Sequence, residues 1–136
     1  MATMASPSTE ERKPIRSFRD LKVWEKAFHL AVDIHRLTGT LSSQVPAGLP
    51  RGMREASVSL TTQIAQGQTH SYLKDFLRCL DHSLAALSDL ETRVLLARSL
   101  KYMEQAICED LEGRIAEVRR MEWGLVNRLR AREASH

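Results

Sequence analysis

Residues 75–94, "DFLRCLDHSLAALSDLETRV", place large apolar side chains at alternating intervals of three and four positions. An α-helix has about 3.6 residues per turn, so this spacing gathers the apolar side chains on one face. The pattern extends on both sides and predicts a helix over residues 72–100, about 40 Å long. The spine of this helix is expected to be Phe76, Leu80, Leu84, Leu87, Leu90 and Val94.

Three other segments repeat this one-sided pattern, over residues 17–38, 51–67 and 103–131. Ser17 is suited to cap the first helix, and Gly39 to end it. No segment alternates apolar and polar residues over a useful length, so we expect no sheet. The apolar stripe of the first helix is predicted to contain Leu21, Trp24, Phe28, Ala31 and Ile34, widened by Val23, Leu30 and Leu37.

Four amphipathic helices with short connections predict an all-α fold, an antiparallel up-down-up-down four-helix bundle. A chain of 136 residues is most simply one domain. The bundle is expected to occupy residues 17–132. Residues 1–16 are polar and contain two prolines, and they are expected to form a disordered tail, as are residues 133–136.

The bulk composition is that of an ordinary globular protein, 43% hydrophobic and 27% charged, with a net charge of +3. This mildly basic balance permits nucleic acid or an acidic partner without demanding either. No apolar run approaches the roughly 20 residues that span a bilayer, and the N-terminus lacks the apolar region of a secretory signal. We therefore expect a cytoplasmic protein without membrane contact, in which the two cysteines are reduced and buried.

Residues 59–67, "SLTTQIAQG", are unusually polar for a helix of such a bundle. Small side chains let two helix backbones approach closely, and their hydroxyls can bond to carbonyls of their own helix. One interpretation is a tightly packed inner helix that is half exposed. The other is a partly hydrated contact with a second subunit, made by Ser59, Thr62 and Gln63.

Glu91 lies on or beside the apolar spine of the third helix. An unpaired buried carboxylate costs several kcal/mol, so it is expected to be paired, exposed or protonated. Because the second and third helices run antiparallel, Glu91 is level with the start of the second helix. Arg54 is the expected partner, in a structural ion pair.

Catalytic and metal-binding patterns are weak in this sequence. It contains no glycine-rich phosphate loop, no nucleophile elbow, and no Glu-x-x-His pair of the kind that builds a di-iron bundle. The pairs Glu25–His29 and Cys79–His82 each offer only two ligands. We therefore predict no catalytic residues, no metal, no cofactor and no small-molecule substrate. A small hydrolase or ligand binder with an unrecognised site is the weakest alternative.

Basic residues concentrate at both ends of the sequence, with six in residues 11–26 and six in residues 114–132. In an up-down-up-down bundle these ends lie at the same pole. Arginines at the end of the fourth helix complement its dipole, but cations at the start of the first helix do not. A basic pole without interleaved aromatics suits phosphate contact. The candidate nucleic-acid-binding residues are Arg16, Arg19, Lys22, Lys74, Arg128, Arg130 and Arg132.

Three stretches resemble a known bacterial family in order along the chain. Residues 17–38, "SFRDLKVWEKAFHLAVDIHRLT", are similar to its opening pattern "DLxVW.KA..L". Residues 48–67, "GLPRGMREASVSLTTQIAQG", and 75–94 are similar to its second and third patterns. The family consists of four-helix-bundle proteins encoded within intervening sequences of large-subunit ribosomal RNA genes. It is related to the accessory variability determinants of diversity-generating retroelements.

The resemblance implies a helical bundle without known catalytic activity, and a homo-oligomer, most simply a pentamer. It also implies binding to nucleic acid and to a reverse transcriptase. The sequence and the resemblance together predict a non-enzymatic accessory protein that binds structured RNA through its basic surface. The alternative is a protein-interaction scaffold whose basic pole meets an acidic protein, with no role for nucleic acid.

Overall fold

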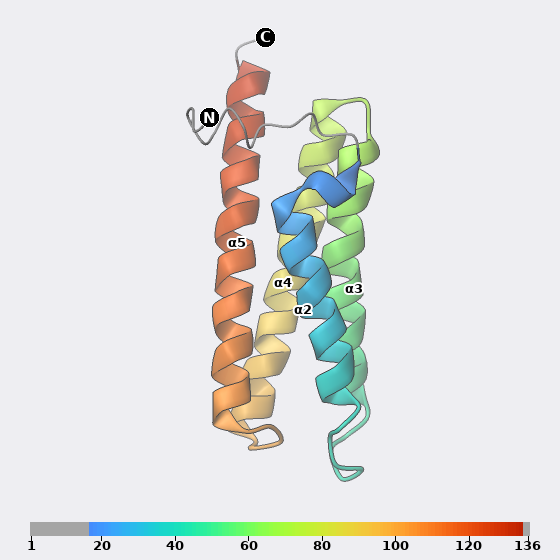
Figure 1. Ribbon diagram of the computed structural model, residues 1–136, viewed down its shortest axis with the longest axis vertical. Helices are drawn as coiled ribbons and strands as arrows, with labels where there is room; N and C mark the ends of the chain where they lie inside the picture. Colours follow the sequence, from blue (N-terminus) through green and yellow to red (C-terminus); the bar gives the residue numbers. More distant parts are fainter. Residues whose placement is uncertain (1–16, 135–136) are drawn as a thin grey trace, which may run out of the picture.

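The computed structural model describes residues 17–134 and contains four long α-helices that run antiparallel (Figure 1). Contacts join α2 to α3, α3 to α4, α4 to α5, and α2 to α5, which closes a four-helix bundle. The predicted all-α architecture is therefore confirmed. The elements are the 3₁₀ turn η1 (Phe18–Asp20), α2 (Lys22–Thr38), α3 (Gly48–Thr69), α4 (Leu73–Ser99) and α5 (Gln105–Ala134).

The helix boundaries differ from the sequence expectation by two to five residues in the first, second and last helices, and α3 runs from Gly48 to Thr69 where the sequence predicts residues 51–67. Ser17 forms the expected capping box with Asp20, but the box opens the 3₁₀ turn, and α2 begins only at Lys22. At the other end, α5 continues to Ala134, two residues past the expected limit of the bundle. Residues 133 and 134, expected in the disordered C-terminal tail, are therefore helical. The rest of that expected tail, residues 135–136, and the expected tail over residues 1–16 lie outside the described residues.

One apolar cluster fills the space between the four helices. Most of the predicted spine of α4 is fully buried there, whereas Phe76 and Leu84 are half-buried. The largest fully buried apolar side chains are Leu30 and Ile34 of α2, Met53, Leu60 and Ile64 of α3, Leu80, Leu87, Leu90 and Val94 of α4, and Leu111 and Ile115 of α5.

The apolar stripe of α2 is turned from its predicted orientation. The buried line runs through Val23, Ala27, Leu30 and Ile34, whereas Phe28, expected in the core, is 42% exposed. The sequence stripe is wider than the face that α3 and α5 cover, so its outer edge reaches the surface. There Trp24 stacks on Phe28, with their ring centroids 5.0 Å apart.

The small polar residues of α3 serve close packing on its inner side. Ser57 and Thr61 are buried, and their hydroxyls donate to carbonyl oxygens of α3 itself, at 2.8 Å each. Gly67 lies against α4, where an added Cβ would approach Phe76 Cδ1 to 2.8 Å and Cys79 Cβ to 2.9 Å. The interpretation of α3 as a tightly packed, half-exposed helix is confirmed at these positions.

The Ser83 hydroxyl of α4 joins three helices at the centre of the bundle. Its oxygen lies 2.9 Å from the Leu60 carbonyl of α3 and 2.9 Å from Glu122 Oε1 of α5. A hydroxyl has one proton to donate, so both bonds form together when a protonated Glu122 donates to Ser83 and Ser83 donates to Leu60. Burial raises the pKa of Glu122 to about 8, against the lowering effects of Ser83 and Arg119.

The contrast between two helical glycines gives a test of the α3–α4 packing. We expect Gly67→Ala to lower the free energy of unfolding by ~1–3 kcal/mol, because its Cβ meets Phe76 and Cys79. Gly113→Ala is the matched control, since nothing lies within 4 Å of an added Cβ. It should raise stability by ~0.5–1 kcal/mol through helix propensity. Urea unfolding measures both, and stabilisation by Gly67→Ala would contradict the close approach.

The buried Glu122 predicts a pH-dependent stability difference. Its pKa is about 8 in the folded chain against an ordinary 4.5. Only the unfolded chain releases this proton between those values, so rising pH lowers stability, by at most ~1.4 kcal/mol per pH unit. Glu122→Gln cannot ionise. The unfolding free energy of this variant relative to wild type should therefore increase from about pH 5 to about pH 8. A difference that stays constant would mean that Glu122 does not carry the proton.

Candidate functional site

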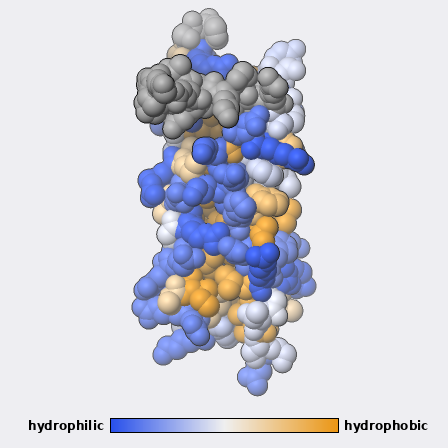
Figure 2. Space-filling model, in the orientation of Figure 1, coloured by the Kyte–Doolittle hydropathy of each residue, from blue (hydrophilic) through white to orange (hydrophobic). Residues whose placement is uncertain are grey.

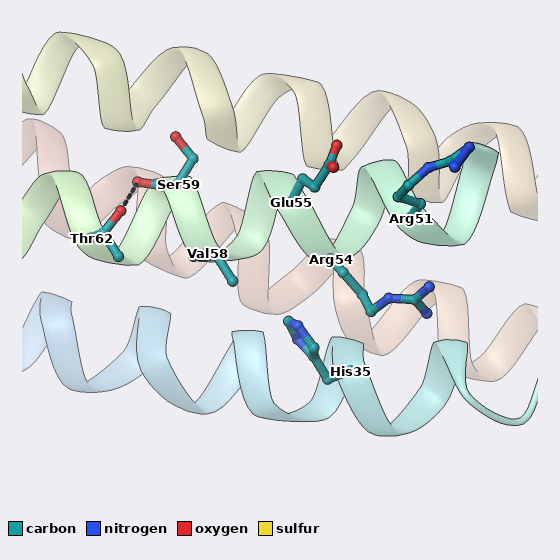
Figure 3. Close-up of a pocket in the computed structure, with 7 residues that line it drawn as sticks. All are labelled: His35, Arg51, Arg54, Glu55, Val58, Ser59 and Thr62. Carbon is teal, nitrogen blue, oxygen red and sulfur yellow. Dashed lines mark hydrogen bonds between the residues drawn. The ribbon is translucent and has the colours of Figure 1, made fainter. Parts of the chain in front are cut away.

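An open groove of about 490 Å³ lies between α2 and α3 (Figure 3). From α3, Arg54 and Val58 point toward α2, whereas Arg51 and Glu55 point away from it. The groove continues into a neighbouring apolar hollow of about 450 Å³, which adds Phe28, Ala31, Val32, Arg36 and Thr61 to the shared His35, Val58 and Thr62. We call the two hollows together the α2–α3 groove.

The α2–α3 groove contains two of the three predicted subunit-interface residues. Ser59 and Thr62 line it, and the Thr62 hydroxyl donates to the Ser59 carbonyl oxygen at 3.3 Å. Gln63 is half-buried and does not line it. Val58 is 45% exposed, so an apolar side chain sits uncovered at the middle of the groove. Figure 2 shows apolar side chains reaching this face of the molecule among hydrophilic ones.

The expected ion pair between Arg54 and Glu91 is wrong. Arg54 donates to the Thr38 hydroxyl at 2.9 Å, and Glu91 accepts from Arg119 of α5 at 2.8 Å. The antiparallel level was correct, since Gly52 of α3 packs directly beneath Arg93 of α4. The expected orientation of the two side chains about their helix axes was wrong, because Arg54 points to α2 and Glu91 faces α5. The height of a residue along the bundle, which the sequence predicts, does not by itself determine which neighbouring helix its side chain contacts.

Six of the thirteen arginines in residues 17–134 form ion pairs with carboxylates of that range. Ion pairs join Arg119 to Glu91 and Arg114 to Asp33, and Arg98 reaches both Glu109 and Glu112. These pairs fix α5 against α2 and α4. Arg36, Arg78 and Arg93 are paired within their own helices, to Asp33, Asp75 and Asp89.

By contrast, three cations near the start of α2 and in the second half of α5 have no such partners among residues 17–134. A groove of about 440 Å³ between the start of α2 and the second half of α5 brings Lys22, Arg120 and Arg128 together. All three are exposed, and none forms an ion pair within residues 17–134. Asp20, which also lines the groove, accepts from the Ser17 amide at 3.3 Å. We call this site the basic groove; its other lining residues are Leu21, Val23, Met121, Gly124 and Leu125.

The structure brings only part of the predicted basic pole into one site. Lys22 and Arg128 lie in the basic groove, whereas Arg130 lies over the ring of Trp123, 5.8 Å from its centroid. The sequence analysis missed Arg120, although it precedes Arg128 by two helical turns on the same face. The remaining candidates in the described residues are Arg19 in η1, Lys74 at the start of α4 and Arg132 at the end of α5, and all three are exposed. These element ends lie near the upper end of the bundle in Figure 1. Arg16 lies outside the described residues.

The two aromatic residues near the pole, Trp123 and Tyr72, are both exposed. No aromatic side chain was expected among the cations of the pole, and the exposed position of Trp123 corrects that expectation. Trp123 is 42% exposed on α5, one residue before Gly124 of the basic groove.

The described residues hold no group of three or more side chains arranged to bind a metal ion. Cys79 is buried whereas His82 is exposed, so this pair does not converge. Both cysteines are free and buried, and burial is the largest influence raising the pKa of the Cys108 thiol. Within residues 17–134, none of the helices combines the length and the apolar character that crossing a bilayer requires.

The antiparallel helices and the closed apolar core define a four-helix-bundle protein, and both grooves described above are open to its surface. More specifically, the chain belongs to the 23S rRNA-intervening sequence protein family, whose model matches residues 19–124. The resemblance to that family is thereby confirmed. No curated protein sequence matches the chain.

A solved structure supports the fold. It is the crystal structure of a protein of unknown function from the S23 ribosomal protein family of Bacteroides thetaiotaomicron. The two folds superpose with a TM-score of 0.72 at 17% sequence identity, covering 76% of this chain and 97% of the other. At this identity the similarity concerns the fold alone. Neither comparison bears on diversity-generating retroelements.

Proposed function

We propose that this chain is a non-enzymatic, oligomeric accessory protein that binds structured RNA through its basic groove. The observation that carries the proposal is the convergence of Lys22, Arg120 and Arg128, none of which has an acidic partner in the described part of the chain. Elsewhere on the bundle, six arginines form ion pairs with carboxylates. Clustered cations repel each other, and bound phosphate groups offset this repulsion. Binding of the cations to RNA phosphates also releases the counterions condensed on the RNA, which favours the complex.

Helix dipoles do not account for the basic groove. The positive end of the α2 dipole lies at Lys22, where a further cation is unfavourable, and Arg120 is in the interior of α5. The name of the family refers to 23S rRNA, which favours RNA as the first ligand to test. Contacts of this kind fix position on the phosphate backbone and carry no base sequence information.

A double substitution tests the proposal. Changing Arg120 and Arg128 to Gln should weaken binding to a hairpin RNA and flatten its salt dependence. Each lost phosphate contact lowers the slope of log K against log salt by ~0.7–0.9, so we expect a decrease of about 1.4–1.8. Both residues are exposed, so the unfolding free energy should stay within about 1 kcal/mol of wild type.

The control removes the same charge elsewhere. Arg78 and Lys101 are exposed and lie outside both the basic groove and the α2–α3 groove, and their joint change to Gln should leave the salt slope nearly unchanged. Equal slopes in wild type and the groove variant would contradict RNA binding at this site. An acidic protein would then be the better candidate partner. A reverse transcriptase as a further partner stays a prediction.

The proposed assembly rests on two separate exposed apolar patches. A closed ring of identical subunits needs two different, complementary surfaces on each chain. One is the α2–α3 groove, where Phe28 and Val58 are uncovered. The other is a leucine patch at the end of α4, formed by exposed Leu95, Leu96 and Leu100. Arg51 and Glu55 add charges of both signs beside the groove, neither with an ion-pair partner among residues 17–134.

Light scattering tests the assembly. We expect a wild-type mass near five times the 15.4 kDa of one chain. Val58→Glu and Leu96→Glu each place a charge on one of the two surfaces, and each should shift the mass toward 15.4 kDa. Tyr72→Glu is the control, because Tyr72 is exposed outside both patches. A wild-type mass of one chain at micromolar concentration would rule out the oligomer. If both Glu variants kept the mass of the wild-type oligomer, the interface between the α2–α3 groove and the leucine patch would be ruled out.

A further inference from the structure

An exposed aromatic ring lies beside the basic groove with a cation over it. Trp123 of α5 is 42% exposed, and the guanidinium of Arg130 lies 5.8 Å from its ring centroid. Arg130 forms no ion pair within the described residues. A single exposed apolar side chain is ordinary on a protein surface. A planar cation held over an exposed indole, next to unpaired cations, is the arrangement in which nucleic-acid bases stack.

The helical geometry of α5 connects this pair to the basic groove. Arg120, Gly124 and Arg128 recur at intervals of four residues and line the groove along one side of the helix. Trp123 and Arg130 lie on the adjoining side, because each residue is rotated by about 100° from the previous one. The Arg128 guanidinium lies beside Gly124, 3.4 Å from the position that an added Cβ would take, so this cation of the groove is held next to the residue that follows Trp123. A nucleotide chain whose phosphates contact Arg128 is thereby brought close to the exposed ring.

We propose that Trp123 and Arg130 form a stacking platform for an unpaired base of an RNA whose phosphates occupy the basic groove. This inference rests on the proposed function and narrows its ligand to RNA with accessible unpaired nucleotides, as in a loop or a bulge. The bases of a continuous A-form duplex are stacked on each other, and their faces are closed to an indole. Stacking on Trp123 therefore selects loops or bulges over uninterrupted duplex without reading a sequence.

The test compares two hairpin RNAs that differ only in their loops. One has ordinary loop nucleotides, and the other has abasic loop positions, which keep every phosphate and remove the bases. Wild-type protein should bind the ordinary hairpin ~5- to 150-fold more tightly per stacked base. Trp123→Leu keeps an apolar side chain without an aromatic face and should lose this preference. Trp123→Phe should retain most of it.

Fluorescence and charge variants supply independent readings. In a Trp24→Phe background Trp123 is the sole tryptophan, and the ordinary hairpin should quench its emission while the abasic hairpin should not. Arg130→Lys keeps the charge but removes the planar guanidinium, and it should weaken the preference for the ordinary loop.

Each outcome separates this inference from the proposed function. Equal affinity for the two hairpins, with unchanged emission and no effect of Trp123→Leu, would overturn the stacking platform and leave phosphate binding in the basic groove intact. Absence of binding to both hairpins at low salt would overturn the proposed function, and this inference with it.

Discussion

The hydroxyl of Ser83 is the contact on which the arrangement of three helices depends. It lies 2.9 Å from the Leu60 carbonyl of α3 and 2.9 Å from the Glu122 carboxyl of α5. Apolar contacts tolerate small rotations and shifts of a helix, whereas a buried hydrogen-bond chain is satisfied in only one register. Among residues 17–134 no group hydrogen-bonds to the second oxygen of Glu122, and burial raises the pKa of this carboxyl to about 8, which favours the protonated form.

The orientation of α5 follows from this contact and positions the basic groove. With Glu122 turned inward among Val118, Leu125 and Leu129, the opposite side of α5 faces solvent. Arg120 is exposed on that side, and so is Trp123. The ion pairs of Arg114 with Asp33 and Arg119 with Glu91 hold the same rotation from the flanks of the helix. Core and surface are thus coupled: the helix that supplies the proposed RNA contacts is oriented by its buried carboxyl.

The two grooves divide the surface by chemistry. The α2–α3 groove exposes apolar side chains because the stripe of α2 is wider than the face its neighbours cover, and such a surface suits contact between subunits. The basic groove collects three cations that form no ion pair with a carboxylate among residues 17–134, and it suits phosphate. The grooves lie on the two sides of α2, so assembly through one leaves the other free. The family membership is consistent with both proposals and specifies neither.

The sequence by itself determined the number of helices, their approximate limits and the antiparallel bundle, because a strict three-and-four spacing has one helical solution. It also placed Lys22 and Arg128 at one end. Only the tertiary structure decided how each helix is rotated about its own axis. It paired Glu91 with Arg119 instead of Arg54, brought Phe28 to the surface, and buried Glu122. Glu122 follows Val118 by one turn and so lies within the apolar stripe of α5. From the sequence alone a glutamate at such a position is expected to be exposed, because the sequence does not show that Ser83 of α4 will bond to it. The physical reason is that periodicity identifies a face of each helix, whereas contacts between helices decide which part of that face is covered.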